Sequence, residues 1–71
     1  MKPNDKLATR RLLNKAIEEQ MSVELGYPVR AMMAARRGDA KSQKLFDDIA
    51  LQATRNIVLL KSRVNDINKE S

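Results

Sequence analysis

Residues 46–67 read FDDIALQATRNIVLLKSRVNDI, and this stretch decides the fold class. Its apolar residues are separated alternately by four and three positions, which is the spacing of one face of a coiled-coil helix. The members of this stripe are Phe46, Ala50, Ala53, Ile57, Leu60, Val64 and Ile67. Because no glycine or proline interrupts residues 39–71, the pattern predicts one long helix over about residues 40–68.

A first helix is expected upstream, over about residues 5–25. Asn4 or Asp5 is a suitable N-cap for it. Gly26 favours the left-handed conformation in which many helices end, and the proline at position 28 cannot donate a backbone hydrogen bond. The apolar residues that recur every four positions in this segment are Leu13, Ile17, Met21 and Leu25.

A short second helix is expected over about residues 29–37, with Pro28 in its first turn. Gly38 would end this helix, and Asp39 would cap the long helix that follows. The sequence therefore predicts an all-α protein of three helices, at about residues 5–25, 29–37 and 40–68. They would form a helical hairpin with a long C-terminal helix, in a single small domain over residues 1–71.

The composition excludes several classes of function. The 71 residues contain no cysteine and no histidine, so disulfides are absent and a zinc site lacks its usual ligands. The same absence removes the cysteine nucleophile and the histidine base on which many enzymes depend near neutral pH. We therefore expect a non-enzymatic protein without a cofactor or metal. No apolar run approaches the roughly 18 residues of a membrane span, and no signal peptide is evident. The expected location is the cytoplasm.

The long helix is apolar on more than one face, which predicts packing on more than one side. Leu45, Leu51 and Leu59 lie off the main stripe, and residues 57–60 are apolar around a whole turn. A chain this short also buries little surface by itself. We therefore expect a homo-oligomer or a partner protein on the stripe from Phe46 to Ile67. The alternative is a compact three-helix monomer that uses every apolar face internally.

The formal net charge is +5, and the basic residues gather in two clusters that are candidate contacts for nucleic-acid phosphates. Positive charge in the first half of a helix opposes the helix dipole, so local stability does not account for the first cluster. The candidate nucleic-acid-binding residues are Lys6, Arg10, Arg11, Lys15, Arg30, Arg36 and Arg37. The alternative is that these side chains are solvated, bond to a neighbouring helix, or stabilise a helix end.

Residues 29–53 read VRAMMAARRGDAKSQKLFDDIALQA, in which a short helix ends at Gly-Asp and an apolar helix follows. This run resembles a pattern of small helical proteins of phages and prophages, roughly A-x-x-G-D-x-x-x-x-x-L-x-x-x-A. The residues that carry the resemblance are Ala34 or Ala35, Gly38, Asp39, Leu45, Phe46 and Ile49. The family is similar to, or found beside, the small subunit of the DNA-packaging terminase. The resemblance implies a phage protein that works with nucleic acid.

These observations predict a small, basic, non-enzymatic helical protein of phage type. It would bind DNA or RNA, or a nucleic-acid-processing complex, through its basic face while self-associating through its long C-terminal helix. With Tyr27 and Phe46 as its only aromatic residues, it lacks a stacking platform, and we expect sequence-tolerant binding. The alternative function is a protein-binding regulator or inhibitor that docks an exposed face of the long helix on a larger host protein.

Overall fold

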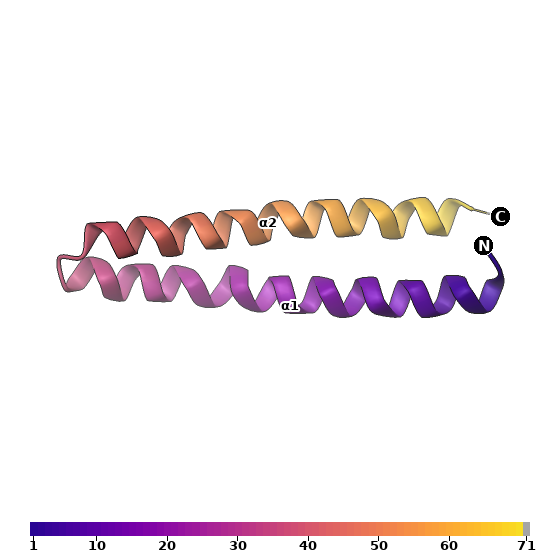
Figure 1. The fold of residues 1–71 in the computed structure, drawn as a ribbon, viewed down its shortest axis with the longest axis horizontal. Helices are drawn as coiled ribbons and strands as arrows, with labels where there is room; N and C mark the ends of the chain where they lie inside the picture. The colour runs from indigo at the N-terminus through magenta and orange to yellow at the C-terminus, as the bar shows by residue number, and fades with distance from the viewer. Residues whose placement is uncertain (71) are drawn as a thin grey trace.

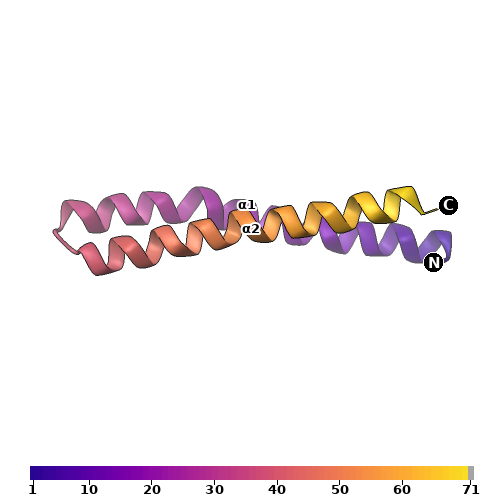
Figure 2. The same ribbon diagram turned by 90° about the horizontal axis from the view of Figure 1, so that it is seen from above.

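The protein is a hairpin of two long antiparallel helices, as the computed structural model of the chain shows over residues 1–70 (Figure 1). Helix α1 spans Pro3–Arg36 and helix α2 spans Ala40–Lys69. The rod measures 53 × 14 × 11 Å, and both chain ends lie at the same end of it. Seen from above, the two helices cross near their middle (Figure 2). This crossing is typical of two helices that wrap around one another.

The described residues are all-helical, as predicted, and the predicted hairpin fits in part, but the prediction of three helices is wrong. The chain does not break at Gly26 and Pro28, because α1 continues through both residues to Arg36. Packing across this point outweighs the local helix-breaking signal. Tyr27 lies against Phe46 of α2, with the ring centroids 5.9 Å apart, while Pro28 faces solvent. The missing N–H of Pro28 therefore costs one helical hydrogen bond without disturbing the contact with α2.

The turn between the helices matches the sequence-based prediction. Gly38 has a φ of 74°, in the left-handed region that favours glycine. Its N–H donates to the carbonyl of Ala35 at 3.0 Å, and the N–H of Asp39 donates to the carbonyl of Ala34 at 3.0 Å. This pair of bonds is the Schellman motif, which satisfies the last carbonyls of α1 and turns the chain back within three residues.

Asp39 caps α2 by accepting a hydrogen bond from the backbone N–H of Ser42 at 3.0 Å. The side chain and the backbone N–H of Ser42 hold the pKa of the Asp39 carboxyl below its ordinary value of 3.8. A carboxyl whose pKa is lowered by folding stabilises the native state above its unfolded pKa. That contribution is lost as the pH falls through the folded pKa.

We expect Asp39→Asn to lower the midpoint of thermal unfolding at pH 7, because asparagine keeps the cap but loses the charge at the N-terminus of α2. The wild type should lose this advantage as the pH falls below 3.8 and Asp39 becomes protonated. Thermal melts at pH 7 and at a series of pH values below 3.8 measure the effect. Asp47→Asn is the matched control, since that carboxylate is exposed and accepts no hydrogen bond from residues 1–70. A constant difference between the wild type and Asp39→Asn would contradict the prediction.

The two helices meet along a heptad-spaced contact that we call the hairpin seam. On α2 it consists of the predicted stripe, whose members are all buried or half-buried: Phe46, Ala50, Ala53, Ile57, Leu60, Val64 and Ile67. On α1 the buried and half-buried residues repeat at the same four-three spacing: Leu13, Ile17, Gln20, Glu24, Tyr27, Ala31 and Ala34. The half of the seam near the turn combines four alanines with the Tyr27–Phe46 pair, and larger aliphatic residues fill most of the other half.

The apolar stripe predicted for the first helix is only half right. Leu13 and Ile17 lie in the hairpin seam, but Met21 and Leu25 are 45% and 71% exposed. A strict four-residue repeat drifts around a helix of 3.6 residues per turn, whereas the seam follows the alternating four-three spacing. The seam thus passes from Ile17 to the polar residues Gln20 and Glu24, and the apolar side chains beside them are left outside.

Candidate nucleic-acid interface

The structure divides the seven candidate basic residues between the two ends of the rod. Lys6, Arg10, Arg11 and Lys15 form the terminal cluster beside the chain ends; Arg30, Arg36 and Arg37 form the loop cluster near the turn. Fifteen residues separate Lys15 from Arg30, which is about 22 Å along one helix. The two clusters therefore do not make one continuous patch.

Two members of the terminal cluster bond to the end of α2. The ammonium group of Lys6 donates to the backbone carbonyl of Glu70, and a guanidinium N–H of Arg10 donates to the side-chain oxygen of Asn68 at 3.1 Å. Both basic side chains are half-buried at the hairpin seam, whereas Arg11 and Lys15 are exposed. Lys6 and Arg10 thus bond to the end of α2. Because both acceptors are uncharged, the positive charges of the two side chains are not neutralised by these bonds.

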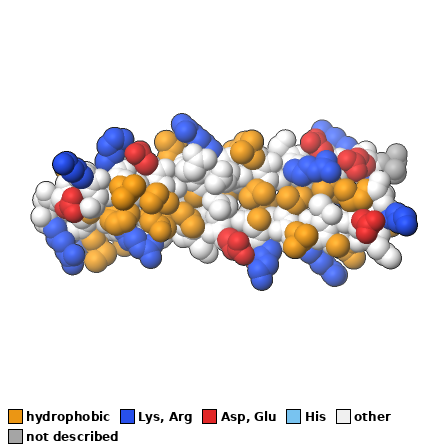
Figure 3. All heavy atoms as spheres, viewed as in Figure 1, with side chains coloured by type: hydrophobic (Ala, Val, Ile, Leu, Met, Phe, Trp, Pro, Cys, Tyr) orange, Lys and Arg blue, Asp and Glu red, His pale blue; other side chains and the backbone are white. Residues whose placement is uncertain are grey.

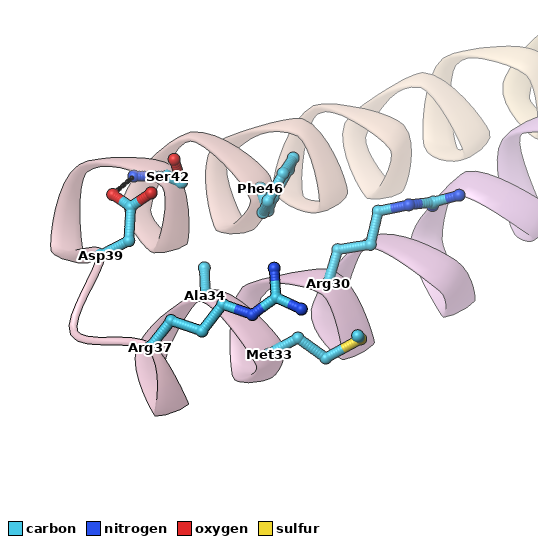
Figure 4. A pocket seen from close by; sticks show the side chains of 7 residues that line it. All are labelled: Arg30, Met33, Ala34, Arg37, Asp39, Ser42 and Phe46. Carbon is cyan, nitrogen blue, oxygen red and sulfur yellow. Dashed lines mark hydrogen bonds between the residues drawn. The ribbon is translucent and has the colours of Figure 1, made fainter.

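The loop cluster borders an open pocket of about 500 Å3 on one side of the turn (Figure 4). Arg30 lies over the ring of Tyr27, with its guanidinium carbon 4.6 Å from the ring centroid. Figure 4 shows Phe46 projecting from α2 toward the pocket, opposite Arg30 on α1 and Arg37 at the start of the turn. Gly26 admits this arrangement, because a Cβ there would meet Arg30 Nη1 at 3.3 Å. The pocket joins an apolar floor to two positive side chains.

The third member of the loop cluster, Arg36, does not line this pocket. It lies instead beside Met32, with a guanidinium nitrogen 4.0 Å from the sulfur atom. Figure 3 shows hydrophobic side chains gathered between the helices toward the turn, with lysine and arginine side chains at their border.

None of the seven candidate residues is neutralised by a carboxylate within residues 1–70. The salt bridges in this part of the chain join Lys44 to Asp48 at 3.1 Å and Arg63 to Glu70 at 3.5 Å. The one carboxylate at the loop pocket belongs to Asp39, which is bonded to Ser42. The candidate cations are therefore available to an external anion at both ends of the rod.

Two polar pairs that join seam residues of α1 to residues of α2 beside the seam were missed by the sequence-based reasoning. Asn56 donates to the side-chain oxygen of Gln20 at 3.2 Å, and the Thr54 hydroxyl donates to the Glu24 carboxylate at 2.6 Å. Continuing the four-three spacing of the first helix through its polar residues Gln20 and Glu24 would have placed both of them at the helix contact. The part-buried Asn56–Gln20 pair favours this register, because a shifted register would leave its polar groups unpaired away from water.

The stripe from Phe46 to Ile67, predicted as an oligomer or partner interface, lies in the contact between α1 and α2 of the same chain. The residues of α2 that face solvent lie beside it and include Leu45, Leu51, Val58 and Leu59. In this hairpin, a second molecule would meet these side chains rather than the hairpin seam.

No family model, curated protein or solved structure matches this sequence. Within residues 1–70, no helix is long and apolar enough to cross a membrane, and no three potential ligands gather as a metal site would require.

Proposed function

We propose that this protein is a non-enzymatic, self-associating helical hairpin that binds nucleic acid, or a nucleic-acid-processing complex, in the cytoplasm. The phage-type resemblance of residues 29–53 favours a role beside DNA. The observation that carries the proposal is the set of seven lysine and arginine side chains that have no carboxylate partner within residues 1–70 and lie toward the two ends of the rod. Binding a polyanion would neutralise them and release counterions, which is the main source of sequence-independent affinity.

The separation of the two clusters defines how such a complex is held. A rod of 53 Å with a basic cluster at each end contacts phosphates that are far apart along a duplex or on neighbouring segments. The middle of α1 carries Glu18 and Glu19, both exposed, which disfavours contact there. We therefore expect each cluster to contribute separately to affinity, without a base-reading element between them.

We expect the wild type to bind unrelated duplexes with similar affinity and with a steep dependence on salt. Six or seven phosphate contacts per chain predict a slope of log affinity against log salt of about −5 to −6. The double variant Arg30→Gln and Arg37→Gln, which removes the two cations of the loop pocket, should make this slope less negative by about 2. Fluorescence anisotropy between roughly 50 and 200 mM salt measures it. The matched control is Arg55→Gln with Lys61→Gln, two exposed basic residues outside both clusters.

Absence of binding at low salt, or an equal effect of the control, would overturn the nucleic-acid proposal. The second candidate function would then take its place, namely a regulator that docks on a larger protein. It is favoured by the solvent-facing apolar residues of α2, among which Val58 and Leu59 are 64% and 68% exposed.

A further inference from the structure

The hairpin carries a second apolar stripe that lies outside the hairpin seam. On α1 this second stripe consists of Met21, Leu25, Pro28 and Met32, separated by four, three and four residues, and all four are exposed. Leu51 and Val58 of α2 extend it, because they share a face with Thr54, whose hydroxyl bonds to Glu24 beside Leu25. The four-three spacing is the one with which a helix meets another helix.

Within residues 1–70, no segment outside the two helices is long enough to cover the second stripe. Residues 3–36 and 40–69 are already helical, and the turn has only three residues. The chain exposes 5497 Å2, whereas a compact monomer of 8.1 kDa exposes about 4,500 Å2. Its radius of gyration is 16.3 Å, against about 11 Å for a compact chain of this length. The excess surface is close to the roughly 800 Å2 that each partner contributes to a standard interface.

We infer that a second copy of this chain covers the second stripe, giving an antiparallel dimer of hairpins packed as a four-helix bundle. This inference rests on the self-association in the proposed function and names its surface. A second copy supplies a helix with the same four-three stripe, so each α1 gains the apolar neighbour that it lacks within one chain.

Charge at the ends of the second stripe selects the antiparallel arrangement. Glu18 lies three residues before Met21 and is exposed, whereas Arg36 lies four residues after Met32 and touches its sulfur atom. The two charges are thus nearly equidistant from the centre of the stripe. An antiparallel dimer places Glu18 of each copy beside Arg36 of the other, and a parallel one would place like charges together. Arg36 would thereby gain a carboxylate partner in the dimer, and the six other candidate basic residues would remain for phosphate contacts.

The test is the oligomeric state of two leucine variants on α1 in the absence of nucleic acid. Leu25 and Leu12 are 71% and 72% exposed, but they lie thirteen residues apart, which turns Leu12 about 140° away from the second stripe. In sedimentation equilibrium we expect a dimer for the wild type and for Leu12→Lys. Leu25→Lys should raise the dimer dissociation constant at least tenfold. Circular dichroism verifies that each variant is helical.

Two further variants keep the inference testable if Leu25→Lys fails to fold. Glu18→Lys should weaken the dimer, and adding Arg36→Glu to it should restore the dimer, because the pair of charges is exchanged. A monomeric wild type at about 100 μM, or equal weakening by Leu12→Lys and Leu25→Lys, would overturn the inference. A monomer that still bound duplex with a steep salt dependence would refute the dimer alone and leave nucleic-acid binding standing.

Discussion

Ile57→Asp is expected to abolish the folded hairpin. Ile57 is buried in the hairpin seam, where it packs against α1. The substitution removes apolar contacts worth about 2–5 kcal/mol and places a carboxylate where Gln20 and Asn56 already bond to each other. A chain of this length has a free energy of unfolding of roughly 4–10 kcal/mol, so the lost contacts together with the cost of the buried carboxylate remove most or all of it.

Far-UV circular dichroism with urea titration measures this effect on the free energy of unfolding. The matched control is Leu59→Asp, two residues away on the same helix but 68% exposed. We expect the control to keep its helical signal and most of its stability. A cooperative transition for Ile57→Asp at the wild-type urea midpoint would show that the hairpin seam does not hold the helices together.

Pro28→Ala is expected to raise stability, by about 2 kcal/mol in the free energy of unfolding. Proline inside a helix removes the N–H that would bond to the carbonyl four residues earlier, here that of Glu24, and costs about 3 kcal/mol relative to alanine. Part of this gain is offset, because proline also restricts the unfolded chain. Since Pro28 is exposed, its ring contributes little to the contact between the helices.

The midpoint of thermal unfolding should rise by roughly 10 °C for Pro28→Ala, measured at one fixed protein concentration. Pro3→Ala is the control, because Pro3 opens α1 and its missing N–H has no partner within the helix. A lower midpoint for Pro28→Ala than for the wild type would mean that the ring at position 28 makes a stabilising contact that the hairpin alone does not have.

The sequence predicts the parts of the fold that depend on short-range rules. The turn at Gly38 and Asp39 needs one residue in the left-handed conformation and one capping carboxylate, and both can be recognised in the sequence. The α2 side of the seam can also be recognised in the sequence, because every seam residue from Phe46 to Ile67 is apolar. In these places the local preference and the packing of the hairpin agree.

The interruption expected at Gly26 and Pro28 shows where sequence reasoning fails. A glycine and a proline within three residues usually separate two helices, but Tyr27 between them packs on Phe46. Tyr27 and Phe46 lie nineteen residues apart in the chain, so the residues close to Pro28 in the sequence do not reveal that the helix continues. The polar layers at Gln20 and Glu24 hide the seam of α1 in the same way, since they interrupt its apolar periodicity.

The candidate site was predictable as a list of residues but not as an arrangement. Charge alone identifies two basic clusters, and the helical hairpin places them at opposite ends of the rod. The contacts of Lys6 and Arg10 with the last residues of α2 depend on how the two helices align over their whole length. Spacing within the first helix gives no sign of that alignment.

The short turn also determines how the molecule responds to force. Both chain ends lie at the same end of the rod (Figure 1), so pulling on them separates the helices one layer at a time instead of shearing the seam. The layers near the ends join residues 58 and 64 positions apart and open first, whereas the Glu24–Thr54 layer spans only 30 positions. When a molecule is pulled by its two ends, its helices should therefore separate first beside the terminal cluster, while the half beside the turn remains paired.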